Sequence, residues 1–413
     1  MNITGFKEIL QKLSILKNYS WLVLPVAIAL VSVLLFIPTE LMSGSLRKQV
    51  ESKSVSGGKT VQSLSKGTVV RDQWQVEQEF QEAYKADADK TALLMLQSCQ
   101  RPLLNYKMFP EPTDKSTLVF EMFGKQFREG MEGMLTRIRV TDCPTDAELK
   151  SSLQRSGVSG IRRSMGWGMG AFPGMSEVDA TITEVLCNDK AKSASVYVNP
   201  VDLSGYEFWK EYEYAGMDES LEDCWYGQLG YWIIADVIDT VEAMNAGSST
   251  VFTSPVKRIL DVSFSQERRT LGRRSGVGRR PHYVISFEDE LSAPSTQRRS
   301  DGEIDIIHFN VSVVVSSQAV LPFMKELCSA KTHKFKGFSG KEPEQEFKHN
   351  QITVLETSIR SINMTDENHS LYRYGEDAVV DLEMVCEYLL LRKSYEEIKP
   401  ETVKTLLVDD FTG

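Results

Sequence analysis

The side chains best suited to chemistry, the cysteines and histidines, are spread along this 413-residue chain. The cysteines are Cys99, Cys143, Cys187, Cys224, Cys328 and Cys386. No two of them form a CxxC pair, and no histidine lies at ligand spacing beside them, so we expect no metal site. Their even number is compatible with disulfides in an oxidising compartment, and equally with buried free thiols.

The histidines argue against a catalytic site in residues 98–205. They are His282, His308, His333, His349 and His369, all outside that region. A general base there would have to be Asp or Glu, and no paired-carboxylate spacing stands out. We therefore expect no catalytic residue and no cofactor. The alternative is an envelope-anchored enzyme or ligand-binding protein with its site in 98–205.

A glycine- and methionine-rich segment, Ser156–Met175, superficially resembles two kinds of catalytic loop. Its SGVSG sequence has Val158 where a GxSxG nucleophile motif has serine. Its later glycines lack the GK[ST] end of a phosphate-binding loop. We interpret the segment as a loop with apolar side chains that could contact a partner. These are Met165, Trp167, Met169 and Phe172.

A basic segment is the strongest candidate for ligand binding. Its arginines, set among glycines, are Arg268, Arg269, Arg273, Arg274, Arg279 and Arg280. They predict an anion or acidic-partner site, for lipid headgroups or a glycan phosphate, or else a solvated insert between strands. The whole chain is acidic, with a net charge of −10, which argues against nucleic acid as its main partner.

An apolar run near the N-terminus, Trp21–Ile37, predicts a membrane anchor. Its 17 residues carry no charge and reach the lower limit for crossing about 30 Å of hydrocarbon. The predicted anchor side chains are Trp21, Leu22, Val23, Leu24, Val26, Leu30, Leu34, Leu35, Phe36 and Ile37. A cleaved signal peptide is the alternative, because the small residues 43–45 follow. We expect the N-terminus inside, since long C-terminal domains translocate largely regardless of local charge.

The length predicts two or three domains, and 41% hydrophobic with 25% charged residues is ordinary for globular chains. We expect a short cytoplasmic N-terminus at 1–18, a transmembrane helix at 19–38, a stalk or coiled-coil-like segment at 39–97, an α+β domain of uncertain fold at 98–205, a module at 206–394 with an Arg-rich insertion at 267–303, and a charged tail at 395–413.

The middle region is the hardest to assign. Thr117–Phe123 resembles a strand, and Lys125–Val140 has the apolar spacing of a helix. A second helix is expected at Asp146–Gln154, with Thr145 as its cap. Ala194–Asn199 alternates like a short strand.

The C-terminal half has the clearest periodicity. It predicts helices at Ser220–Asn245 and Ser317–Ala330 and strands at Val256–Ser265, Asp305–Ser316, Gln351–Asn363 and Ala378–Arg392. Two such αββ halves can form one four-stranded antiparallel sheet with both helices on one face. The α+β fold would leave the other face or an edge open to a like module.

This order of anchor, stalk and αββαββ module resembles the inner-membrane alignment proteins of type IV pilus and type II secretion machines, the PilO and GspM group. The resemblance covers about half of the chain and includes no short diagnostic motif. It implies a ferredoxin-like module without catalytic residues. The insertion at 98–205 and the basic segment depart from that family.

The resemblance also implies a function. The chain would be a single-pass scaffold of the bacterial inner membrane, with its C-terminal part in the periplasm. It would form a homodimer, or a heterodimer with a sister bitopic protein, through module–module association. Pilus or secretion-machine subunits would be its further partners.

Overall fold

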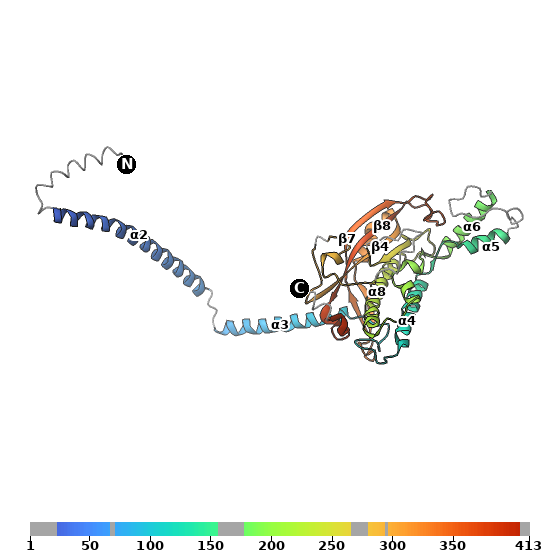
Figure 1. Ribbon diagram of the computed structural model, residues 1–413, viewed down its shortest axis with the longest axis horizontal. Coiled ribbons are helices and arrows are strands. Elements are labelled where there is room, and N and C mark those ends of the chain that lie inside the picture. Colours follow the sequence, from blue (N-terminus) through green and yellow to red (C-terminus); the bar gives the residue numbers. More distant parts are fainter. Residues whose placement is uncertain (1–22, 67–70, 156–176, 266–279, 294–295, 405–413) are drawn as a thin grey trace, which may run out of the picture. The chain divides into compact units, whose positions relative to one another are not determined.

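The computed structural model describes residues 23–66, 71–155, 177–265, 280–293 and 296–404 (Figure 1). The chain divides into two compact units, Met1–Asp89 and Lys90–Gly413. The second unit spans both of the domains expected at 98–205 and 206–394. Those two segments therefore belong to one folded body.

The first unit contains the helix α2 (Val23–Lys66) and most of α3 (Arg71–Cys99). Within the part of the chain that is described, no helix has the length and apolarity needed to cross a bilayer. The expectation of a transmembrane helix is therefore wrong. Trp21 and Leu22, at the start of the predicted run, lie outside the described residues, and α2 continues through the polar residues 39–66 that were expected to form a separate stalk.

The second unit is built on a six-stranded sheet in the order β1-β2-β3-β4-β8-β7. Its strands are β1 (Val140–Thr141), β2 (Val196–Tyr197), β3 (Val256–Ser263), β4 (Ile304–Ser316), β7 (Ile352–Ser361) and β8 (Val379–Leu391). β1, β2 and β3 run parallel, and the pairs β3–β4, β4–β8 and β8–β7 are antiparallel. A separate hairpin joins β5 (Lys331–Phe335) to β6 (Gln345–His349).

This topology overturns the expected ferredoxin-like module with a four-stranded antiparallel sheet. The sheet is mixed because β1 and β2, from the region 98–205, extend it beyond β3. These strands are two residues long, too short to give the alternation of a longer strand. Residues 98–205 therefore complete the sheet instead of forming a domain of their own.

The helices of this unit are α4 (Thr117–Arg137), α5 (Asp146–Arg155), α6 (Glu177–Ser193), α7 (Tyr206–Lys210), α8 (Met217–Met244), α9 (Val320–Leu327) and α10 (Arg392–Tyr395), with 3-10 turns at Pro200–Asp202, Phe287–Asp289 and Ser317–Ala319. The long helix α8 confirms the element predicted at 220–245. Asp218 and Glu219 stabilise its first turn, and Asn245 caps its end.

The core lies between α8 and one face of the sheet (Figure 1). Alternate residues of β4, including Phe309, Val311 and Val313, point to this core, as expected for a strand with one buried face. The opposite face is not open as predicted. Val314 on that face packs in a second cluster with Tyr372 and Tyr374, from the loop between β7 and β8.

Residues 117–123 form a helix, so the strand predicted there is wrong. Ser116 begins α4, because its hydroxyl accepts a hydrogen bond from the Leu118 amide at 3.2 Å. Phe120, Phe123 and Phe127 are buried at helical spacing. The strand-like run of apolar residues was too short to distinguish the two periods.

The predicted cap of α5 is confirmed. The Glu148 amide donates to the Thr145 hydroxyl, and the Thr145 amide donates to the Glu148 carboxylate. The two contacts form a reciprocal capping box.

The C-terminal segment is docked up to residue 404, where a loose charged tail was expected. Tyr395, Ile398 and Val403 are buried in the main core. The carboxylate of Asp305 in β4 binds Lys399. Both charged side chains of this pair are buried, and the spacing of apolar residues in the sequence gives no sign of such a pair. Residues 405–413 lie outside the described part.

Candidate functional site

The structure places the predicted sites only in part. Of the expected anchor residues, Leu24, Leu30, Leu34 and Phe36 are more than half exposed on α2. The glycine- and methionine-rich segment 156–175 lies wholly outside the described residues, and five of the six predicted arginines, within 266–279, also lie outside them. The sixth, Arg280, can be placed.

Arg280 is engaged by the first turns of α8. Its guanidinium forms ion pairs with Glu222, at 2.7 Å, and with Asp223, and it lies 5.2 Å from the ring centre of Tyr226. Burial raises the pKa of both carboxyl groups, although Arg280 counteracts part of that rise. The charge of Arg280 is thus already paired with carboxylates of the same chain.

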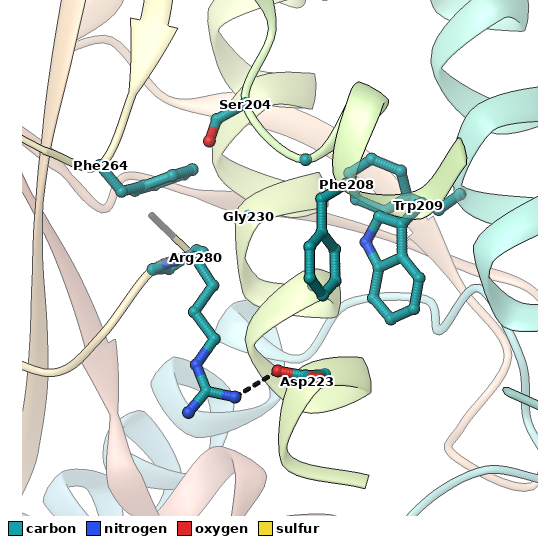
Figure 2. A pocket seen from close by; sticks show the side chains of 11 residues that line it. Ser204, Phe208, Trp209, Asp223, Gly230, Phe264 and Arg280 are labelled. Carbon is teal, nitrogen blue, oxygen red and sulfur yellow. Dashed lines mark hydrogen bonds and ion pairs between the residues drawn. The ribbon is translucent and has the colours of Figure 1, made fainter. Parts of the chain in front are cut away.

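Beside Arg280 lies the cavity drawn in Figure 2. Phe208 and Trp209 of α7 form one wall, and Phe264 lies opposite them. Arg280 and Asp223 also line the cavity, and the dashed line marks the contact between them. The volume is about 20 Å³, enough for a single water molecule. Binding sites for small molecules occupy about 300–1,000 Å³, so this cavity does not offer a substrate site.

A second recess, of about 140 Å³, lies where α4 and α8 end. Arg137 at its rim pairs with Asp239 and Glu242. Arg139, in the left-handed region with φ of 50°, donates to the Ser248 carbonyl at 2.8 Å. Both arginines are therefore held by protein acceptors.

Potential metal ligands and cysteines are the other residue types suited to chemistry. No group of three potential metal ligands occurs within the described ranges. All six cysteines are free thiols, four of them buried and two, Cys143 and Cys328, partly exposed. Burial raises the pKa of Cys224 and Cys386 well above the usual range of a thiol. Such thiols are poor nucleophiles.

The strongest polar constellation is buried and joins distant parts of the second unit. Arg101, just after α3, forms a bidentate ion pair with Asp236 of α8. Its two terminal guanidinium nitrogens lie 2.7 and 2.9 Å from the two carboxylate oxygens. Both side chains are at most 5% exposed. His349 of β6 lies 3.1 Å from Asp236, and the hydroxyl of Tyr388 lies 2.8 Å from it. The segment after α3 and the strands β6 and β8 thus meet at a carboxylate of α8.

A chain of contacts extends from Asp236 through two histidines. The Nδ1 atoms of His349 and His333 are 2.9 Å apart, and Nε2 of His333 lies 2.6 Å from the carbonyl oxygen of Gln100. A carboxylate and a carbonyl only accept hydrogen bonds, so each Nε2 atom must carry a proton. The Nδ1–Nδ1 contact needs one further proton. Three protons on four nitrogens leave the pair with one positive charge.

Burial and neighbouring charges shift two pKa values in this constellation. Burial alone would raise the pKa of Asp236, but the charge of Arg101 and the hydrogen bond from His349 outweigh it, and the pKa falls to about 2. Burial is the main cause that lowers the pKa of His333 to about 4; the hydrogen bond to Gln100 opposes this shift, and the charges of His349 and Arg101 contribute to it.

Sequence reasoning missed this constellation because its members are far apart in the chain. One signal was available. Asp236 lies between Ile233 and Val237 on the apolar face of α8, and a carboxylate there requires a buried partner. Nothing in the sequence pointed to Arg101 or His349 as that partner.

The most exposed ordered element of the sheet is the edge strand β7. It pairs with β8 on one side, and no strand of the described residues lies on its other side. A bulge interrupts the register between Val354 and Glu356, and regular pairing continues to Ser361. Ile359 is 56% exposed and Arg360 carries a side chain 55% exposed. This edge presents apolar and charged side chains together.

Comparisons with known proteins give little further guidance. No family model matches the chain, and no curated protein matches it. A crystal structure from Akkermansia muciniphila is similar over 77% of this chain and 95% of its own, at 10% sequence identity and a TM-score of 0.25. A likeness at that level supports no statement about fold or activity.

Proposed function

We propose that this chain is a non-catalytic assembly protein, a scaffold that acts by association of its sheet module with a like module. The observation that carries the proposal is the ten-residue strand β7 at the edge of the sheet. Pilus or secretion-machine subunits, which the family resemblance implies, are the class of further partners to test.

An edge strand offers unpaired backbone donors and acceptors, and proteins usually protect such edges. Common protections are short strands, proline, covering loops and charges. β7 has ten residues and no proline. Its bulge protects only the beginning of the strand, near Val354, and leaves residues 356–361 regular. The later half is therefore suited to strand addition by another chain.

The rival proposal, a catalytic or ligand-binding site in 98–205, receives less support. The cavity with walls from that region has room for a single water molecule, and the two arginines at the second recess are already paired with protein acceptors. Neither has the converging free polar groups of a substrate site.

The proposal can be tested by placing a charge on the edge. Ile359→Lys should disrupt edge pairing while changing the free energy of unfolding by less than about 0.5 kcal/mol, because the side chain is exposed. Leu321→Lys is the matched control, since Leu321 is 75% exposed on α9. Sedimentation velocity of the full-length chains, over a range of concentrations, measures the association.

We expect the wild type and Leu321→Lys to associate, and Ile359→Lys to remain monomeric. Equal association of all three proteins would show that β7 is not the contact. The assembly role would be refuted if the wild type stays monomeric at every concentration and is also monomeric when it is extracted from its native source.

A further inference from the structure

We infer that the partner strand of β7 is β7 of a second copy, paired antiparallel about Ser358. This inference rests on the proposed function and specifies its partner and register. Edge strands of two identical chains can join through a two-fold axis, which gives an isologous contact. Residues equally far before and after Ser358 then lie opposite each other.

The charges of β7 are self-complementary in this register. Glu356, Ser358 and Arg360 are two residues apart, so they share one face of the strand. Pairing about Ser358 places Glu356 of each copy opposite Arg360 of the other. The two-fold axis creates this ion pair twice. Opposite charges at directly paired positions stabilise a sheet, and like charges destabilise it.

The other face of the strand is equally compatible. Thr357 of one copy lies opposite Ile359 of the other, again twice. Both are β-branched residues, which pack well across strands. Ile359, 56% exposed in the single chain, would then be covered. The contact therefore explains the most exposed apolar side chain of β7.

Three other registers fit less well. Pairing about Arg360 sets the two Arg360 side chains against each other, and pairing about Glu356 does the same for the two carboxylates. Pairing about Thr357 leaves Arg360 opposite the apolar Val354. The bulge between Val354 and Glu356 also prevents a regular ladder from extending toward the start of β7.

Existing contacts within the chain do not compete strongly with this arrangement. Arg360 lies 3.5 Å from Glu383 of β8, with the Arg360 side chain 55% exposed. Glu356 accepts a hydrogen bond from Ser292 at 2.7 Å. An arginine has several donors and a carboxylate several acceptor sites, so each can keep its present partner while it binds across the edge.

Charge reversal tests the register. Glu356→Arg sets two arginines opposite each other at both pairs, and Arg360→Glu does the same with two carboxylates. Each single variant should raise the dimer dissociation constant at least about tenfold. The double variant restores opposite charges in reversed order and should return the constant close to the wild-type value. Sedimentation velocity of full-length chains measures all four.

A cysteine at the axis gives an independent readout. Ser358→Cys places two thiols directly opposite each other, within the range of a disulfide. Under mild oxidation we expect a covalent dimer, with peptide mapping identifying the 358–358 link. Ser361→Cys is the matched control on the same strand, because residue 361 lies opposite 355 and should not link to itself.

The outcomes separate this inference from the assembly role. If Ile359→Lys abolishes association but the double charge reversal does not restore it and position 358 does not link, then β7 docks a different strand and the self-pairing is wrong. If the wild type never associates, both are wrong. Restoration together with a 358–358 link supports both.

Discussion

Replacing Asp236 by asparagine tests the buried constellation most directly. Asp236 is 1% exposed and holds Arg101, 4% exposed, through both carboxylate oxygens. Asparagine keeps the volume and removes the charge. The guanidinium of Arg101 then stays buried without its counter-ion, and Nε2 of His349 no longer faces a charged acceptor.

The expected cost follows from the burial. Removing one partner of a buried ion pair lowers the free energy of unfolding by about 3–5 kcal/mol, because the other charge remains desolvated. Asp239→Asn is the matched control on the same helix. Asp239 pairs with Arg137, but these side chains are 29% and 46% exposed. A pair so exposed contributes at most about 1 kcal/mol.

Urea denaturation of the full-length proteins, followed by tryptophan fluorescence, gives both values. For a slope of about 3 kcal/mol per molar urea, Asp236→Asn should lower the midpoint by about 1 M or more, and Asp239→Asn by about 0.3 M or less. Similar midpoints for the two variants would refute the reasoning, since they would show that Asp236 and Arg101 are not desolvated together.

Two further predictions follow. Burial lowers the pKa of His308 to about 4, and the Leu291 amide donates to its Nδ1. The unfolded chain therefore binds this proton first as the pH falls below 6.5, and stability decreases between pH 6.5 and 4. His308→Gln should reduce that decrease by up to about 3 kcal/mol in urea titrations at pH 7 and 4, and an unchanged decrease would contradict it. On α4, a Cβ at Gly124 would lie 2.9 Å from the Trp209 ring, whereas none of the protein lies within 4 Å of one at Gly133. Gly124→Ala should therefore lower the free energy of unfolding by about 1–3 kcal/mol, and Gly133→Ala should raise it by up to about 1 kcal/mol. Thermal melts measure both changes, and a Gly124→Ala protein more stable than Gly133→Ala would contradict the packing.

Local periodicity accounts for what was predicted well. The apolar stripe of α8 and the alternation in β3, β4, β7 and β8 are set by neighbouring residues, and the structure has these elements within a few positions of their expected ends. The run at Thr117–Phe123 failed because seven apolar-rich residues fit both a strand and one face of a helix. The apolar run at Trp21–Ile37 was read as an anchor from its composition, and that expectation is wrong.

The sequence alone determined the repeating elements of the second unit, because the period of apolar residues fixes which face of a helix or strand is buried. It also placed charge and β-branched residues along β7. Only the tertiary structure decided that β7 is an edge, that β1 and β2 join β3, and that Arg101, Asp236, His333 and His349 meet. Contacts such as that between Arg101 and Asp236 join residues 135 positions apart in the chain. They depend on how whole elements pack, which no local spacing records.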